Sequence, residues 1–154
     1  MSSYSNWRKN RAIGGRAESI FIDDFITFLG LQYRDMRDND LFRGMDVDFL
    51  VNNKKYEIKN NSDPKYILFQ EYKNYEKKEL GWFYTSKTDY FVFVMPDRKM
   101  IILKNTTDFK IYYKNNIKNK KIKKDDYVFM EKSLFYKVPI SKLYGFIAIF
   151  ERKL

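Results

Sequence analysis

Residues 45–59, MDVDFLVNNKKYEIK, carry the strongest fold signal in the chain. Apolar and charged side chains alternate on both sides of the pair Asn52-Asn53. An alternation with a period of two predicts β-strands that have one apolar and one charged face. Because Asn tolerates positive φ angles, the Asn-Asn pair suits a two-residue type I′ turn. The segment therefore predicts a tight β-hairpin.

The turn also fixes which residues oppose each other across the hairpin. The expected pairs are Val51 with Lys54, Phe49 with Tyr56, Asp48 with Glu57, Val47 with Ile58, and Asp46 with Lys59. Directly opposed residues have Cβ atoms roughly 4.5–5.5 Å apart, so Asp48 and Glu57 need a counter-charge. A divalent cation that keeps several water ligands, as Mg²⁺ does, would supply it. The alternative is a solvated hairpin in which Asp46 pairs with Lys59, and Glu57 with Lys55.

The order Asp48, then Glu57-Ile58-Lys59, resembles the core motif of the PD-(D/E)XK nuclease superfamily, an acid on one strand followed by acid-x-Lys on the next. Upstream, Glu18 lies in a predicted helix after the basic segment 7–11, as a helical Glu does in the archaeal Holliday-junction resolvases of that superfamily. The resemblance covers roughly residues 8–95. This chain departs from the motif in lacking a Pro before the acid and in the short gap between Asp48 and Glu57.

The resemblance implies Mg²⁺-dependent hydrolysis of a DNA phosphodiester, with Mn²⁺ as a substitute ion. Asp48, Glu57 and the carbonyl of Ile58 would bind the metal, and the short gap leaves Asp46 as the alternate ligand. Lys59 would orient the attacking water and offset charge on the phosphate. Glu18 would assist through water or a second ion. A polar residue on the helix after acid-x-Lys often faces such sites, which makes Gln70 or Glu71 an accessory candidate, with plain solvent exposure as the alternative.

The implied fold is α/β: a mixed central β-sheet flanked by helices, in the restriction-endonuclease-like order of helix, β-hairpin, helix and strand. The pattern predicts helices over 16–29, 66–78 and 108–115. It predicts strands over 31–34, 89–95, 99–103, 127–131, 134–138 and 146–150, of which 89–95 is apolar enough to be buried on both faces. We expect one domain over 1–154, with a flexible basic arm at 1–15 and a β-rich C-terminal extension at 105–154. The final strand, FIAIF, is apolar enough to be central or to seal a dimer.

Composition narrows the chemistry further. The chain has a formal net charge of +10, which favours a polyanionic partner. The chain has no His, which excludes nuclease mechanisms that depend on histidine. It has no Cys, which excludes thiol nucleophiles and zinc sites built from cysteine. The chain contains no P-loop motif, so the sequence predicts no nucleotide cofactor. No apolar run or signal peptide predicts a membrane partner, so the expected location is the cytoplasm, or the host cytoplasm if the chain is phage-encoded.

Basic residues throughout the chain are candidates for contact with the DNA backbone, which they would hold without selecting sequence. They are Arg8, Lys9, Arg11, Arg16, Lys87, Lys118, Lys120, Lys121, Lys123 and Lys124. Solvated loops are the alternative for all of them. The sequence leaves three substrates as alternatives. They are branched DNA cut by a symmetric homodimer, duplex DNA cut by a restriction-type or phage enzyme, and RNA. A catalytically inactive DNA-binding or inhibitor module of the same fold is the competing class.

Overall fold

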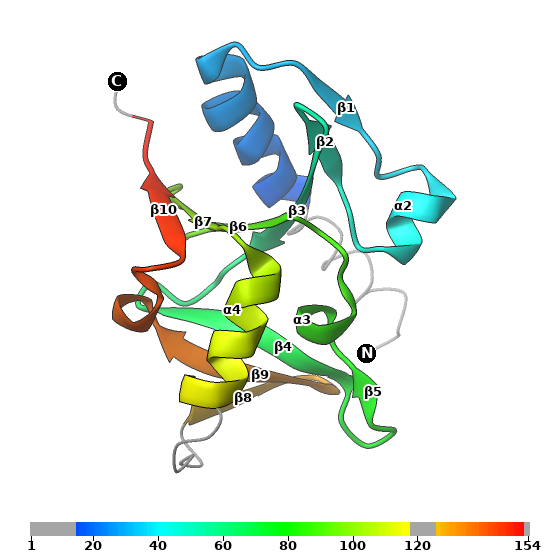
Figure 1. Cartoon of the computed structure of the whole chain (residues 1–154), viewed down its shortest axis with the longest axis vertical. Coiled ribbons are helices and arrows are strands. Elements are labelled where there is room, and N and C mark those ends of the chain that lie inside the picture. The colour runs from blue at the N-terminus through cyan, green and yellow to red at the C-terminus, as the bar shows by residue number, and fades with distance from the viewer. Residues whose placement is uncertain (1–14, 118–125, 153–154) are drawn as a thin grey trace.

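The computed structural model describes residues 15–117 and 126–152 and contains two β-sheets with helices around them (Figure 1). The first sheet has the order β1 (Tyr33–Asp35), β2 (Phe49–Val51), β3 (Lys54–Asn60), β6 (Tyr90–Val94), β7 (Met100–Leu103) and β10 (Ile147–Phe150). The second has the order β5 (Glu79–Leu80), β4 (Tyr66–Asn74), β9 (Ser133–Pro139) and β8 (Tyr127–Met130). Strands β3 and β6 run parallel and the other pairs are antiparallel, so the fold is α/β with a mixed sheet.

The helices are short apart from the first. Residues 15–29 are helical, with a π-helical stretch η1 (Phe21–Thr27) inside. The others are α2 (Asp40–Gly44), α3 (Trp82–Thr85), α4 (Thr106–Tyr112), which continues into the π-helical η2 (Tyr113–Ile117), and the 3₁₀ turn η4 (Ile140–Leu143). The first and third predicted helices are thus confirmed. None of the helices within the described ranges is long and apolar enough to cross a membrane.

The predicted hairpin is present as β2 and β3. Phe49 pairs with Tyr56 and Val51 with Lys54, as the turn requires. Asn52 and Asn53 have φ angles of 52° and 64°, which confirms the turn of positive φ angles. The ladder ends at the Phe49–Tyr56 pair, so the expected pairs Asp48–Glu57 and Val47–Ile58 are wrong. The N–H of Asp48 donates to the carbonyl of Tyr56, and the N–H of Val47 donates to the carbonyl of Phe42.

Asp46 has a φ of 56°, and its backbone N–H donates to the carbonyl of Arg43 rather than across to β3. The expected pairing of Asp46 with Lys59 is therefore wrong.

The predicted helix over 66–78 is wrong, because this segment forms strand β4. Ile67 and Phe69 point into the core, and the strand pairs along its length with β9. The apolar residues of this segment fit both the helical spacing and the strand spacing. Pairing with the distant strand β9 favours the strand. As a result, the crossover from β3 to its parallel neighbour β6 runs through β4, β5 and α3 instead of through a helix.

The first sheet is covered on both faces. Helix 15–29 packs on one face through a cluster that includes Phe21, Phe49 and Val92. The second sheet, α3 and α4 pack on the other through Phe69, Phe91 and related residues. Strand β6 sends alternate residues into both clusters, which confirms that it is buried on both faces.

The C-terminal strands take part in both sheets. Strands β8 and β9 form half of the second sheet, and β10 pairs with β7 at the edge of the first. The expectation that FIAIF is central is wrong, since the side chain of Ile149 is half-exposed at this edge. Its role in a dimer stays a prediction.

Candidate active site

Glu57 is the buried acid of the site. Strand alternation on β3 directs Tyr56 and Ile58 toward helix 15–29, where both contact its apolar cluster. Glu57 and Lys59 consequently extend to the opposite face, toward α3 and the second sheet. The parallel neighbour of Glu57 is the buried Phe91, and the Glu57 side chain retains only 7% of its exposed surface. An acid is therefore held inside the protein next to aromatic side chains.

One oxygen of Glu57 is paired and the other is not. Oε1 lies 2.7 Å from Nζ of Lys59. Oε2 is buried and meets no hydrogen-bond donor from residues 15–117 or 126–152. Burial, reinforced by the nearby carboxylates of Asp48 and Asp46, raises the pKa of Glu57 to about 8 although Lys59 opposes the shift. A buried carboxylate oxygen without a partner is costly, and this one is placed where a cation would compensate it.

Asp48 lies next to this pair, just before β2 begins. Its Oδ2 accepts a hydrogen bond of 2.8 Å from the backbone N–H of Ile58. Burial raises the pKa of Asp48 to about 6, and the negative charge of Glu18 adds to the rise, while the bond from Ile58 and the charge of Lys59 oppose it. The structure therefore brings Asp48, Glu57 and Lys59 together, as predicted, although Asp48 is held by the N–H of Ile58 and is not paired with Glu57 in the hairpin ladder.

Lys59 remains protonated in this environment. Burial alone would lower the pKa of its ammonium, but the ion pair with Glu57 and the charges of Asp48 and Asp46 outweigh burial and raise it. The ammonium also lies 4.9 Å from the centre of the Trp82 ring, a cation–π contact. Lys59 is thus a fixed positive charge at the border of the core.

Helix α3 forms one wall of the site. Trp82 and Thr85, three positions apart, lie on the same side of this helical turn. Trp82 covers Lys59, and the hydroxyl of Thr85 donates to Oδ2 of Asp46 over 3.3 Å. The sequence analysis missed both as site residues, because their position depends on the crossover through β4 and β5.

Gln70 positions α3. Its side-chain oxygen accepts a 3.0 Å hydrogen bond from the backbone N–H of Trp82. Gly81, just before the helix, packs so closely that a Cβ there would lie 2.3 Å from the carbonyl oxygen of Gln70. Glu71 is instead buried and accepts a hydrogen bond from the hydroxyl of Tyr113. Both candidates therefore lie on strand β4 rather than on a helix, and the side chain of Gln70 is bonded to the start of α3, which lines the site.

Glu18 extends from helix 15–29 toward the same region. Its carboxylate is paired with Arg37, which also binds Asp35. These two acids raise the pKa of Arg37 well above its usual range, with Asp35 as the main cause. Arg37, which lies 5.1 Å from the ring centre of Phe49, is a neighbour of the site that the sequence analysis did not identify.

The acidic side chains of the site do not form a complete metal-binding site by themselves. Among the residues that the structure describes, no three acidic side chains cluster closely enough to hold a metal ion alone. Asp48 and Glu57 supply two carboxylates, so any ion bound there would need backbone or water oxygens as well.

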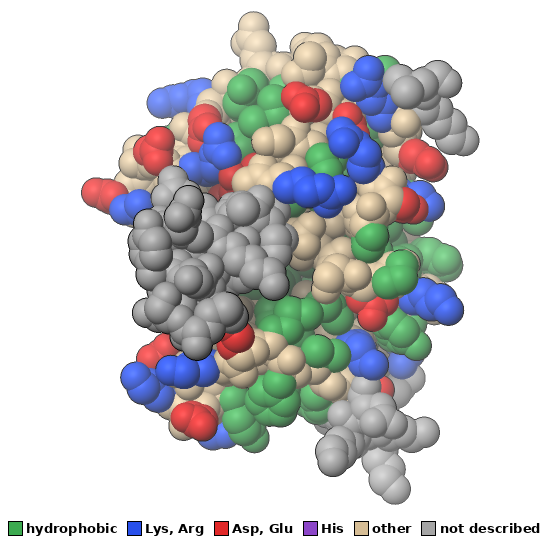
Figure 2. Space-filling view, turned by 180° about the vertical axis from the view of Figure 1, so that it is seen from behind, with side chains coloured by type: hydrophobic (Ala, Val, Ile, Leu, Met, Phe, Trp, Pro, Cys, Tyr) green, Lys and Arg blue, Asp and Glu red, His purple; other side chains and the backbone are tan. Residues whose placement is uncertain are grey.

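The predicted DNA contacts are only partly within the described ranges. Arg16 and Lys87 are exposed, and the backbone N–H of Lys87 donates to the carbonyl of Met45 beside the site. The remaining candidates, Arg8, Lys9, Arg11, Lys118, Lys120, Lys121, Lys123 and Lys124, lie outside these ranges. On the face seen in Figure 2, basic and acidic side chains are interspersed, so charge alone does not mark a path for DNA there.

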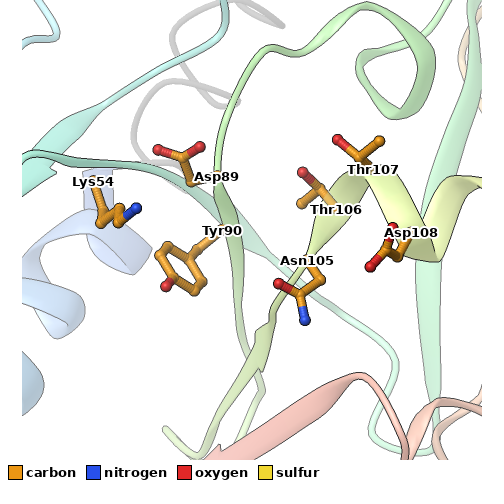
Figure 3. A pocket seen from close by; sticks show the side chains of 7 residues that line it. All are labelled: Lys54, Asp89, Tyr90, Asn105, Thr106, Thr107 and Asp108. Carbon is orange, nitrogen blue, oxygen red and sulfur yellow. The ribbon is translucent and has the colours of Figure 1, made fainter.

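A hollow of about 220 Å³ lies apart from this site, where the starts of β3, β6 and α4 meet (Figure 3). Lys54, Asp89 and Asp108 are among its lining residues. The side chain of Asp89 has a structural role there, since it accepts a hydrogen bond from the backbone N–H of Lys55. This hollow contains none of the side chains that surround Glu57.

A comparison with known proteins found no relative of this chain: no protein-family model, no curated protein and no solved structure matches it.

Proposed function

We propose that this chain is a metal-dependent endonuclease that hydrolyses phosphodiester bonds of DNA. One observation carries the proposal: the buried Glu57 has one oxygen paired with Lys59 and the other without a partner among the described residues, and Asp48 lies beside it. Two carboxylates and a lysine in this arrangement are the groups that a nuclease without histidine needs.

The residues present fit a hard divalent ion such as Mg²⁺ or Mn²⁺. Asp48 and Glu57 would hold it, together with the carbonyl of Ile58. Within a strand, the N–H and C=O of one residue point to the same edge, and the N–H of Ile58 points at Asp48. The Ile58 carbonyl therefore extends toward the same place. Asp46 fits less well, because its backbone turns away at a positive φ and its side chain accepts a hydrogen bond from Thr85.

A bound divalent ion would make a water easier to deprotonate and would stabilise charge on the phosphate. The chain's own residues would do the rest. Lys59 would orient the water and offset negative charge on the phosphate, and Glu57 would hold the Lys59 ammonium at 2.7 Å. Trp82 would confine that ammonium from the side opposite the sheet. Arg16 and Lys87 would contact the DNA backbone.

The order of elements supports the same proposal. Helix 15–29, the hairpin β2–β3 and the strand β6 parallel to β3 occur in the order that the resemblance implies, with β1 and α2 between the helix and the hairpin. The crossover between β3 and β6 departs from that core, since strands replace its helix.

A catalytically inactive nucleic-acid-binding or inhibitor module is the second candidate. The observation that favours it is the state of Glu18, whose carboxylate is paired with Arg37 although it lies near enough to Asp48 to raise the pKa of that acid. The absence of a cluster of three acids within the described residues points the same way.

A cleavage assay separates the two candidates. Purified full-length chain is incubated with four-way junction, nicked, single-stranded and linear duplex DNA, and with RNA of the same sequence, in Mg²⁺, Mn²⁺ or EDTA. We expect cleavage of at least one DNA that requires metal and is lost in Glu57→Gln. Binding of DNA without cleavage in either metal would establish the inactive module instead.

A further inference from the structure

An aromatic groove of about 650 Å³ lies at the open end of the second sheet, between β4, β8 and α3. Its aromatic lining, together with Lys78, comprises Tyr72, Tyr75, Tyr84, Tyr127 and Phe129. Tyr75 is 38% exposed and Phe129 is 59% exposed. Large rings are seldom gathered at an exposed position without a ligand that covers them.

The rings are arranged edge to face. The centre of the Tyr75 ring lies 5.4 Å from that of Tyr72 and 5.6 Å from that of Phe129, with interplanar angles of 81° and 77°. In such pairs the edge of one ring lies on the face of the other, and the ammonium of Lys78 also lies over the Tyr75 ring, so Tyr75 serves mainly as a wall of the groove. Phe129 in particular presents ring surface to a flat ligand.

Among the described residues, the groove is lined by one lysine, Lys78, and by one acid, Glu71, which is buried and accepts a hydrogen bond from the hydroxyl of Tyr113. The ammonium of Lys78 lies 3.5 Å from the centre of the Tyr75 ring and 5.5 Å from that of Tyr72. A cationic ligand would be repelled by Lys78. A ligand that joins a flat ring to a negative phosphate would satisfy both the rings and the ammonium. The formal net charge of +10 favours the same class of ligand.

Helix α3 joins this groove to the site around Glu57. Trp82 and Thr85 lie on the side of the helix that faces the site, whereas Tyr84 lines the groove. An α-helix with its side chains is only about 10–12 Å across. A strand whose phosphate lies at Lys59 therefore reaches the groove within a few nucleotides.

We infer that this groove binds an unpaired nucleobase of the DNA strand, stacked on the exposed ring of Phe129 with a neighbouring phosphate at Lys78. The inference deepens the proposed function, on which its choice of substrate rests: the DNA would carry a single-stranded segment next to the bond that is cut. A base in an intact duplex is stacked on both sides and cannot enter.

The test measures binding in EDTA, where metal-dependent cleavage does not occur. Full-length chain is titrated with a fluorescently labelled single strand, an abasic strand of the same length, and a blunt duplex. We expect the single strand to bind roughly tenfold more tightly than the abasic strand, which has the same phosphates and no bases. Phe129→Leu should abolish this difference while leaving duplex affinity unchanged. Tyr144→Ala, a change at a tyrosine that is 65% exposed and lies outside the groove, is the control.

Equal binding of normal and abasic strands by the wild-type chain would overturn the inference without reference to any variant. Loss of self-association, rather than of base-dependent binding, in Phe129→Leu would also overturn it and would assign the groove to a second copy of the chain. Base-dependent binding with no cleavage in Mg²⁺ or Mn²⁺ would support the groove while rejecting the proposed endonuclease.

Discussion

Glu57 and Lys59 lie at alternate positions of one strand and form an ion pair of 2.7 Å that is largely withdrawn from water. The pair leaves Oε2 of Glu57 buried without a partner from the described residues. The free energy needed to remove two charged groups from water exceeds the free energy gained from a single ion-pair contact, unless further hydrogen bonds satisfy their remaining polar atoms. The pair is therefore better suited to receive a ligand than to stabilise the fold.

Lys59→Ala is expected to abolish cleavage and to leave DNA affinity within about threefold, since the residues proposed to contact the DNA backbone, such as Arg16 and Lys87, lie elsewhere in the chain. Metal-dependent turnover and binding in EDTA are measured on the same preparation. Lys55→Ala removes a lysine from the same strand and serves as the matched control. Full cleavage by Lys59→Ala in excess Mg²⁺ would defeat the role of Lys59.

The free energy of unfolding without metal should fall as the pH rises from about 5 to 8. The folded-state pKa of Glu57 is raised to about 8, so the folded chain holds a proton that the unfolded chain has already released. Asp48, with a pKa raised to about 6, adds to the fall at the lower end of this range. Urea unfolding at several pH values measures the slope, and Glu57→Gln should flatten it. An unchanged slope in that variant would show that another group causes it.

Mg²⁺ or Mn²⁺ should raise the melting temperature, and more strongly at pH 8 than at pH 5, because protons compete for the carboxylates. An ion present at 100 times its dissociation constant adds about 2.7 kcal/mol to the free energy of unfolding. The stabilisation should disappear in Asp48→Asn and persist in Asp46→Asn, since Asp46 is turned toward Thr85. The opposite ranking would make Asp46 the ligand.

Gly81→Ala should destabilise the fold by about 1–3 kcal/mol, because its Cβ would meet the Gln70 backbone at 2.3 Å and displace α3. Gly44→Ala is the control, since a Cβ there meets no atom within 4 Å. Both are compared by urea unfolding, and cleavage is measured on the folded fraction. Equal stability of the two variants would mean that α3 shifts without cost.

The sequence alone determined the hairpin and the juxtaposition of its charges. Both depend on local rules: Asn52 and Asn53 set the turn, and alternation within β3 assigns Glu57 and Lys59 to one face. The N-terminal helix and the buried strand β6 were predictable for the same reason, since each has a single apolar periodicity.

Tertiary structure decided the rest. Residues 66–74 become strand β4 because β9, far along the chain, supplies the pairing edge. That choice redirects the crossover, places α3 over the hairpin and brings Trp82 against Lys59. It also opens the aromatic groove on the other side of α3. Pairing between distant strands leaves no local signature, because its free energy comes from a partner that the segment itself does not contain.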